Sequence, residues 1–394
     1  MKGKVALCVV VLAIVALLGA PWSATAATPT VATGLSCGAT VTSSVRLTND
    51  LLNCPVDGLV VGASGITIDL NGHRITGTSG AGPDDPHRCM CGINDRGGFN
   101  RITLGGGHIE NFVFGADFAV THDIVVRNLT TAVFWEDAVF FDHVVGGLVA
   151  NSNLVNSYRG VETNTSRNIV VRDSIASGIQ HAAVAFFGTR NSVVRDMTIG
   201  AKGGDYGIEI VNSSENLIAH NQVRQFAFDG IFLAGATGLD FVATLPSDRN
   251  SIVDNDVRNG SGYGIEVAES DGGLVRDTLV ARNVIVGINI TDGVQPDGTG
   301  IQVHAYLSAD GQGNPPFRYQ AGVGPSGTRI RANTTNGNAV DGIHLDAPHN
   351  VIAGNVANRN GRWGIYAYPG NTDGGGNRAS GNGRPAQCSG VVCA

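Results

Sequence analysis

The chain is poor in lysine, in aromatic residues and in charge. Its three lysines are Lys2, Lys4 and Lys202, while aromatic residues make up 6% and charged residues 15% of the 394 positions. The net charge is −7 and no basic run occurs, which argues against a nucleic acid as partner. After Leu18 no apolar run is long enough to cross a bilayer, so we expect no membrane span.

The one long apolar run lies at the N-terminus. Lys2 and Lys4 precede it, it extends from Val5 to Leu18, and small residues follow up to Ala26. This order is typical of a secretory signal peptide, and we assign residues 1–26 to it. We therefore expect a secreted or extracellular protein. The excess of arginine over lysine favours a bacterial, GC-rich source.

Polar turn residues recur through the rest of the chain, mostly at steps near 22 residues. Ten define the main series: Asn128, Asn153, Asp173, Asp196, Asn221, Asn255, Asn283, Asn333, Asn355 and Asn377. A second polar residue often stands five positions earlier, as at Asp123, Asn168, Asn191, Asn216, Asn250 and Asn350. We expect the ten side chains to stack inside the turns and to bond the backbone of adjacent repeats.

A tetrad of glycine, apolar, variable and apolar residues follows most of these positions, as in Gly207–Ile210 and Gly264–Val267. The segments alternate with the period of strands, and the repeat is too short for a pair of helices. The sequence therefore predicts an all-β fold, a right-handed parallel β-helix with three short strands per turn. We expect an N-terminal cap over residues 27–56, the coil over 57–381 and a C-terminal cap over 382–394.

Six cysteines remain after residue 26, in three close pairs. In an exported protein such pairs indicate disulfides, and we expect Cys37–Cys54 and Cys388–Cys393 to close the two ends of the coil. A bridge between Cys89 and Cys91 is also expected, although free thiols or a copper site with His87 and Met90 remain alternatives.

Three segments lengthen the repeat: residues 79–90, 235–249 and 304–329. The last two leave the coil just after a tetrad strand, so we expect them to project from one edge and to wall one groove. Insertions in solenoids usually fall on the binding face. A tolerated surface insertion is the alternative.

The third residue of each tetrad should point outward, because its two apolar neighbours point into the coil. This outward series is Asp117, Phe141, Glu162, Ala185, Glu209, Phe232, Glu266, Gln302, His344 and Tyr366. Glu162 and Glu209 would lie two turns apart, about 10 Å, which suits a pair of carboxylates in inverting glycoside hydrolysis. We predict Glu209 as the central catalytic residue, with Glu162, Asp205, Glu266 and His344 as helpers.

Aromatic and amide side chains on the same face could bind sugars. The predicted substrate-binding residues are Phe232, Gln302, Tyr306, Phe317, Tyr319 and Tyr366. We expect an extracellular polysaccharide as the partner and a monomer. No metal or cofactor is expected, although calcium stays possible. Binding without turnover and a plain solvated face are the alternatives.

Two stretches resemble a known group. The run from Leu47 to Gly62, continued from Ile66 to His73, is similar to the opening of secreted bacterial β-helix repeat proteins of the pectin-lyase-like superfamily. The repeats through Asn221 and the ending from Pro385 to Cys393 resemble the same group. The resemblance implies the fold. Its members include pectate lyases, polygalacturonases, alginate lyases and mannuronan epimerases, so it leaves the reaction open.

The motifs that define individual members are missing or out of place. The four polygalacturonase motifs are absent from the sequence. Asp85-Pro86-His87 matches the core of the mannuronan epimerases, but it lies in an early loop without the flanking residues of that family. We interpret the match as chance.

Overall fold

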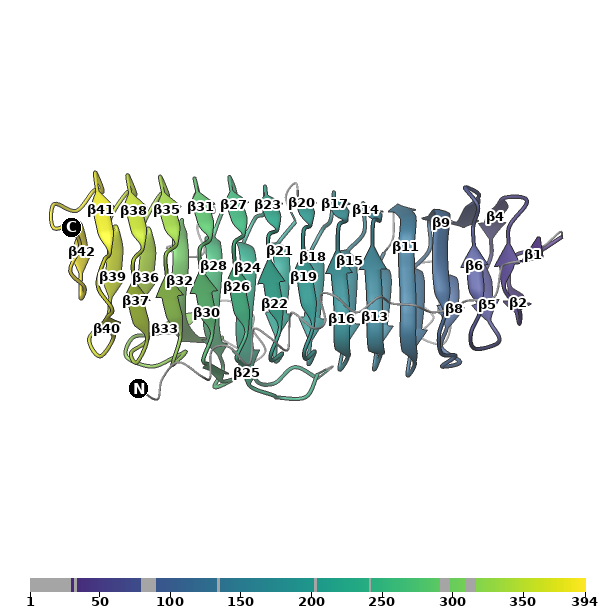
Figure 1. Cartoon of the computed structure of the whole chain (residues 1–394), viewed down its shortest axis with the longest axis horizontal. Helices are drawn as coiled ribbons and strands as arrows, with labels where there is room; N and C mark the ends of the chain where they lie inside the picture. Colours follow the sequence, from purple (N-terminus) through teal and green to yellow (C-terminus); the bar gives the residue numbers. More distant parts are fainter. Residues whose placement is uncertain are drawn as a thin grey trace.

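The chain forms a long coil of parallel strands (Figure 1). The computed structural model describes residues 30–31, 34–78, 90–132, 135–201, 204–240, 242–290, 298–308 and 317–394. Within these ranges all regular structure is strand, and nearly all pairing is parallel. The predicted right-handed parallel β-helix is therefore confirmed. The proposed signal peptide, Asp85-Pro86-His87 and Cys89 lie outside the described residues.

Each turn of the coil contributes one strand to each of three stacked ladders. The first ladder, here called sheet 1, consists of β2 (Ala39–Val41), β5 (Leu59–Val61), β8 (Cys91–Asp95), β10 (Phe114–Ala119), β12 (Asp137–Asp142), β15 (Arg159–Asn164), β18 (Ala182–Phe187), β21 (Tyr206–Val211), β24 (Asp229–Ala236), β28 (Tyr263–Ser270), β32 (Thr299–Leu307), β36 (Ile343–Leu345), β39 (Ile365–Ala367) and β42 (Cys388–Ser389), with β33 (Arg318–Gln320) paired antiparallel to β32.

The other two ladders join into one bent sheet of 25 strands. The second ladder consists of β1 (Thr30–Val31), β3 (Val45–Arg46), β6 (Thr67–Asp69), β9 (Thr103–Glu110), β11 (His122–Ala132), β13 (Val145–Ala150), β16 (Arg167–Arg172), β19 (Val193–Arg195), β22 (Leu217–Ala219), β26 (Ser251–Val253), β30 (Leu279–Ala281), β34 (Arg329–Arg331), β37 (Val351–Ala353) and β40 (Thr372–Asp373).

The third ladder lies beside the second, and β9 and β11 are long enough to belong to both. Its further strands are β4 (Leu51–Cys54), β7 (Arg74–Gly77), β14 (Asn153–Val155), β17 (Ile175–Ser177), β20 (Thr198–Gly200), β23 (Gln222–Arg224), β27 (Asp256–Arg258), β31 (Val284–Val286), β35 (Thr334–Asn336), β38 (Val356–Asn358) and β41 (Arg378–Ser380). A small pair, β25 (Ser247–Asp248) with β29 (Val275–Arg276), lies outside the ladders.

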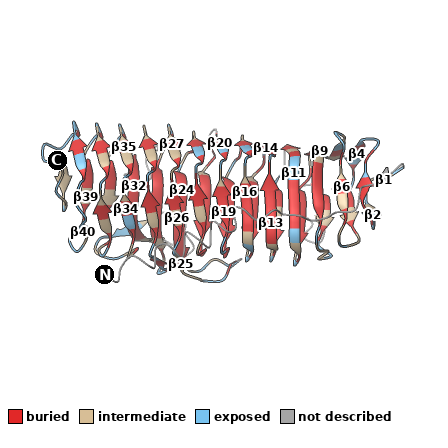
Figure 2. Ribbon diagram, viewed as in Figure 1, coloured by how far each residue is buried: buried red, intermediate tan, exposed pale blue. Residues whose placement is uncertain are grey.

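One apolar core runs the length of the coil (Figure 2). Successive turns place Ile208, Ile231, Ile265, Ile301, Ile343 and Ile365 in one fully buried row. Each turn covers the apolar side chains of the next, so the core is shared between neighbours. Parallel pairing already begins upstream of Asp57, where β2 pairs with β5 and β3 pairs with β6.

The glycine of each tetrad stands where the strand of sheet 1 begins, at a corner of the coil. A Cβ atom on Gly264 would lie 2.4 Å from Ile285 Cγ2 and 2.6 Å from the carbonyl oxygen of Gly300. The glycines of neighbouring turns meet similar contacts. Glycine is required because the backbone of the next turn occupies the space that a side chain would need.

The predicted polar ladder is confirmed in the second half of the coil. Asn221, Asn255, Asn283, Asn333, Asn355 and Asn377 are buried, and each of the first five donates from its backbone N–H to the amide oxygen of the next. Each side-chain amide also donates to a backbone carbonyl oxygen of an earlier turn. Asn216, Asn250 and Asn350 are likewise buried in a second ladder.

The assignment is wrong for Asn128, Asn153, Asp173 and Asp196, which are exposed. The inner position belongs to their neighbours Leu129, Ser152, Ser174 and Met197: Ser152 Oγ accepts from the backbone of Leu129, and Asn221 Oδ1 accepts from that of Met197. The exposed residues lie one position away in the sequence from the residue at the inner position. Three of them adopt left-handed φ angles of 50° to 53°, which Asn and Asp tolerate.

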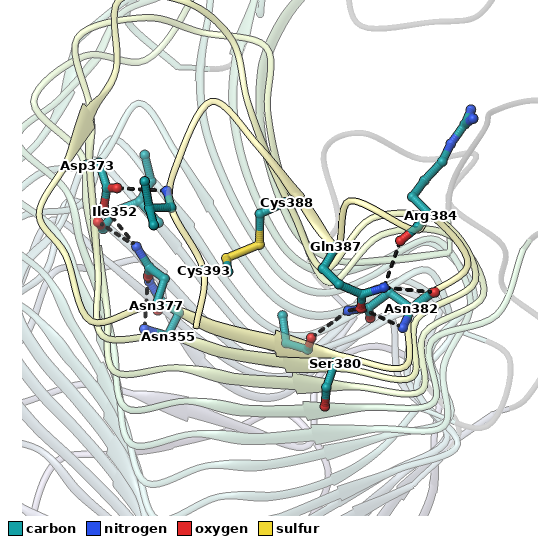
Figure 3. Close-up of a disulfide and its surroundings, with 12 residues drawn as sticks. Ile352, Asn355, Asp373, Asn377, Ser380, Asn382, Arg384, Gln387, Cys388 and Cys393 are labelled. Carbon is teal, nitrogen blue, oxygen red and sulfur yellow. Dashed lines mark hydrogen bonds between the residues drawn. A yellow bond between two sulfur atoms is a disulfide. The ribbon is translucent and has the colours of Figure 1, made fainter.

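Two disulfides close the ends of the coil. The N-terminal disulfide joins Cys37 and Cys54, and the C-terminal disulfide joins Cys388 and Cys393, as predicted. Cys91 is also disulfide-bonded. Figure 3 shows the C-terminal disulfide beside the last residues of the asparagine ladders, where Gln387 accepts the hydrogen bonds of Asn382.

Candidate functional site

The outward column of sheet 1 has the predicted register with one exception. Strand pairing aligns Asp117, Phe140, Glu162, Ala185, Glu209, Phe232, Glu266, Gln302, His344 and Tyr366. The exception is Phe141, which is fully buried in the core while Phe140 takes the outward position. The structure therefore brings the predicted acids onto one face of the coil.

These acids are not a solvated surface. Glu162, Glu209 and Glu266 are 7%, 7% and 5% exposed, respectively. Buried carboxylates need partners, because desolvation of an unpaired charge is costly. The structure supplies a basic or imidazole partner for each of them, so the three glutamates form three separate pairs along the coil.

The central pair is Glu209 with His181. His181 Nδ1 lies 2.7 Å from Asp205 Oδ2, and its Nε2 lies 3.3 Å from Glu209 Oε2. Burial alone would lower the pKa of His181, but the hydrogen bond to Asp205 and the nearby Glu209 carboxylate raise it to about 9. The ring stacks on Tyr158 at a centroid distance of 5.1 Å and meets Tyr206 edge-on at 5.3 Å. His181 is therefore a fixed imidazolium between two carboxylates.

Glu162 pairs with an arginine on its own strand. Arg159 Nη1 donates to Glu162 Oε2 at 2.7 Å. Burial raises the pKa of Glu162, although the Arg159 charge opposes the shift. Asp137, on the preceding turn and aligned with Arg159, is also buried, and desolvation followed by the Glu162 charge raises its pKa well above the ordinary value.

The third pair joins Glu266 to His304. His304 Nε2 lies 2.5 Å from Glu266 Oε1, and burial lowers the pKa of His304 to about 3. A neutral imidazole carries one N–H, so this contact fits an Nε2–H donor and leaves Nδ1 as an acceptor. Within the described ranges His304 Nδ1 has no hydrogen-bond partner.

The predicted aromatic residues of the last insertion gather around His304. Tyr319 stacks on its ring at 5.1 Å, Tyr306 meets it edge-on at 5.6 Å, and Phe317 packs on Tyr306 at 4.9 Å. Tyr263 closes another side at 5.7 Å. The β32–β33 hairpin thus places Tyr306, Phe317 and Tyr319 together, as a cover over the His304–Glu266 pair.

His344 and Tyr366 form a further cluster nearer the C-terminus. His344 Nδ1 lies 2.6 Å from Asp341 Oδ2, and its Nε2 lies 3.0 Å from Asp346 Oδ1. Burial opposes protonation, but these two hydrogen bonds raise the pKa of His344. Gln302 Nε2 donates to Asp346 at 3.2 Å, and Tyr366 stacks on His344 at 4.5 Å. His344 is therefore four turns from Glu209, outside the central cluster.

Phe232 packs in an apolar cluster on the outer face rather than standing free. It is 8% exposed and stacks on Tyr206 at 5.3 Å. Val242 and Leu239, from the segment after β24, pack on the same cluster. Ala236, the last residue of β24, is in register with Ser270, which is in register with Tyr306 on β32. Both insertions therefore extend from the same edge of sheet 1, as expected.

Sequence reasoning missed the basic and imidazole partners. Arg159, Tyr206 and Tyr263 belong to a second outward column, three residues before the first. Reading the same register three positions earlier would have found them. His181 precedes its strand by one residue and is joined to Asp205 only by the stacking of turns, so no local motif marks it.

Over the described part of the chain, no group of three or more His, Cys, Asp or Glu side chains is arranged to hold a metal ion. No helix with the length and apolar character of a membrane span occurs in the described ranges. Lys202, which precedes Asp205 by three positions, lies outside them.

The family model for the right-handed β-helix region matches residues 114–243 and 204–305. These matches include the strands that carry Glu162, Glu209 and Glu266. No curated protein is significantly similar to the chain in sequence. This match and the solved structures below confirm the right-handed β-helix fold that the resemblance implied.

Solved structures share the fold at low identity. The surface adhesin PfbA of Streptococcus pneumoniae has a TM-score of 0.54 at 13% identity, over 81% of this chain and 84% of that one. A double mutant of the periplasmic alginate epimerase AlgG has a TM-score of 0.53 at 12% identity, over 91% of this chain and 77% of that one. The Dettilon tailspike protein has a TM-score of 0.52 at 12% identity, over 76% of this chain and 59% of its own length. At such identities the likeness concerns the fold alone.

Proposed function

We propose that this right-handed β-helix protein binds an extracellular polysaccharide on the outer face of sheet 1 and cleaves it there by acid–base chemistry. The observation that carries the proposal is the contact of one histidine, His181, with both Asp205 and Glu209 at the accessible edge of that face. Groups with displaced pKa values, held close together by charge and burial, are typical of catalytic sites.

The roles follow from the protonation states. His181 keeps its proton at neutral pH because its pKa is about 9, so it can donate that proton to a leaving sugar oxygen. Asp205 and Glu209 orient the ring and stabilise its charge. Glu162 and Glu209 lie two turns apart, about 10 Å by strand spacing, close to the upper end of the separation between the two carboxylates of inverting glycosidases. His181 lies at the Glu209 end of this pair. Glu162 would then activate the attacking water.

Glu266 and His344 would act as binding groups on either side of the aromatic hairpin. Glu266 lies two turns beyond Glu209 in the same column, and His344 two turns further. A polysaccharide running along the coil would pass from one to the next. Tyr366, Gln302 and the hairpin residues Tyr306, Phe317 and Tyr319 would provide stacking faces and hydrogen bonds for neighbouring sugars.

Binding without turnover is the second candidate. One observation favours it: Glu162, Glu209 and Glu266 already have basic or imidazole partners, so the face is electrostatically complete without a substrate. A structural neighbour described as a surface adhesin is compatible with this alternative. In that case the same residues would bind glycan and leave its bonds intact.

Purified protein incubated with a panel of polysaccharides separates the two candidates. New reducing ends indicate hydrolysis, absorbance of unsaturated products indicates elimination, and retention without either signal indicates binding alone. We expect His181→Gln to lower turnover by at least about 100-fold, the usual contribution of a general acid. Glu209→Gln should also lower turnover, because it removes a carboxylate that orients the His181 ring. The matched control is Asp254→Asn, which removes an ion pair with Arg282 away from sheet 1. Full activity in both site variants would refute the catalytic assignment.

Export and oligomeric state complete the proposal. The two terminal disulfides support an oxidising, extracellular location, in agreement with the predicted signal peptide. We propose that the protein acts as a secreted monomer, which light scattering of the purified protein would test. A stable dimer would contradict this part without affecting the site.

A further inference from the structure

The strands that carry the proposed site are strongly acidic. Strands β12, β15, β18, β21, β24 and β28 contain seven acidic residues but a single basic residue, Arg159. The acidic residues are Asp137, Asp142, Glu162, Glu209, Asp229, Glu266 and Glu269. Burial raises the pKa of Asp137 well above its ordinary value, so Asp137 adds little charge. Even without it, and with two others neutralised by Arg159 and His181, four acidic residues remain on these strands against no further basic residue.

Both cations of the site are already engaged. Arg159 donates to Glu162, and His181 lies between Asp205 and Glu209. Among the described residues of the site strands and their edge, neither cation is left to receive the carboxylate of a substrate. A carboxylate brought to His181 would also approach Asp205, whose side chain is 34% exposed.

Other features of the face fit an uncharged sugar. Trp135 and Phe228, 61% and 47% exposed, stand near the two ends of the same edge and offer faces for stacking.

We infer that the site takes an uncharged or amino-sugar polysaccharide and rejects polyuronates. This inference rests on the proposed function and adds the class of substrate to it. The physical reason is electrostatic complementarity: a like charge placed against an acidic surface is repelled, and an ammonium group is attracted. The chain would thereby differ in substrate from the uronate-acting proteins that share its fold.

The test compares polymers of matched backbone that differ in charge. Suitable pairs are polygalacturonate with its carboxyl-reduced form, oxidised cellulose with cellulose oligomers, and chitosan with chitin oligomers. Affinity is measured by titration calorimetry at about 20 mM and about 200 mM salt. We expect the uronate member of a bound pair to bind at least about tenfold more weakly at low salt. This difference in affinity should become smaller at high salt, because screening weakens the repulsion.

A charge-removal variant provides a second readout. Glu136 lies at the edge beside Tyr158, and the Glu136→Gln variant leaves the proposed catalytic residues intact. We expect Glu136→Gln to reduce the affinity ratio between the two members of a pair by about threefold at low salt, while Asp254→Asn leaves this ratio unchanged. An unchanged affinity ratio in Glu136→Gln would contradict the inference.

The outcomes separate the two proposals. Equal or tighter binding of the uronate member overturns the charge inference, and if that polymer is also cleaved, the proposed function still stands. Preferred binding of the neutral or amino-sugar member without cleavage supports the charge inference and refutes the proposal that the protein cleaves its ligand. Failure to bind any pair overturns both.

Discussion

The asparagine ladder makes a prediction whose size can be worked out from its hydrogen bonds. Asn255 is 1% exposed, and its Oδ1 accepts from both the backbone N–H and the side-chain amide of Asn221, each at 3.0 Å. Its own amide donates to the carbonyl oxygen of Ile218 at 3.0 Å and to Asn283 Oδ1 at 3.0 Å. Replacement by alanine removes all of these bonds at once.

The Asn255→Ala variant leaves the Asn221 backbone N–H buried without an acceptor, and one N–H of the Asn221 amide loses its partner as well. Each unsatisfied buried group costs about 1–3 kcal/mol, so we expect a loss of about 4 kcal/mol in the free energy of unfolding. Urea unfolding followed by circular dichroism measures this loss. Hydrogen exchange of the Asn221 amide should accelerate in parallel, because the opening is local.

The matched control is Asp196→Asn, at a position that the sequence pattern also assigned to the ladder. Asp196 is exposed, pairs with Arg195, and has a φ of 53° that asparagine accepts equally well. We expect a change within about 0.5 kcal/mol. A loss below about 1 kcal/mol in Asn255→Ala, or equal losses in both variants, would refute the reasoning from buried unsatisfied groups.

Other predictions concern glycine, histidine and the disulfides. Gly264→Ala should destabilise by about 3 kcal/mol by overpacking a corner, whereas Gly200→Ala, where a Cβ meets nothing within 4 Å, should be tolerated in the same unfolding assay. Stability should decline as pH falls from about 6.5 toward 3, because His304 resists protonation in the fold, and as pH rises from about 6.5 toward 9, because His181 loses its favoured proton. His304→Gln should remove the acid decline and His181→Gln the alkaline one. Reducing the N-terminal disulfide, with a sequence separation of 17, should cost about 3 kcal/mol, against about 2 for the C-terminal one with a separation of 5.

The fold could be predicted from the sequence because the repeat itself encodes it. Each turn needs a glycine where the backbones approach closely and apolar residues on both sides of the outward position, and these requirements recur with every turn. The outward column followed from the same periodicity. Only Phe141 failed, because adjacent phenylalanines in β12 satisfy the pattern equally well in either register.

At two of its four wrong positions, the ladder assignment failed because the sequence offered two polar residues side by side. Asp173 precedes Ser174, and Asn153 follows Ser152, so either member of each pair could have been the inner one. A short serine fits inside the turn as well as an asparagine does, and the adjacent Asp or Asn then takes the exposed position. Spacing alone could not separate these alternatives, because they differ by one residue.

The histidine partners of Glu209 and Glu266 could not be predicted from local sequence for a geometric reason. His181 and Glu209 are 28 positions apart, and Glu266 and His304 are 38 apart, because each contact joins different turns. Each strand carries few outward side chains, so two of the three acid–base pairs draw on two turns, with a spacing set by the loops between them. A catalytic motif in this fold is therefore a set of residues that the strand register aligns on successive turns, and not a run of neighbouring residues in the sequence. It follows that relatives of similar activity should be recognised by aligning the turns of sheet 1, where Arg159, His181 and His304 would be matched together with the acids they hold.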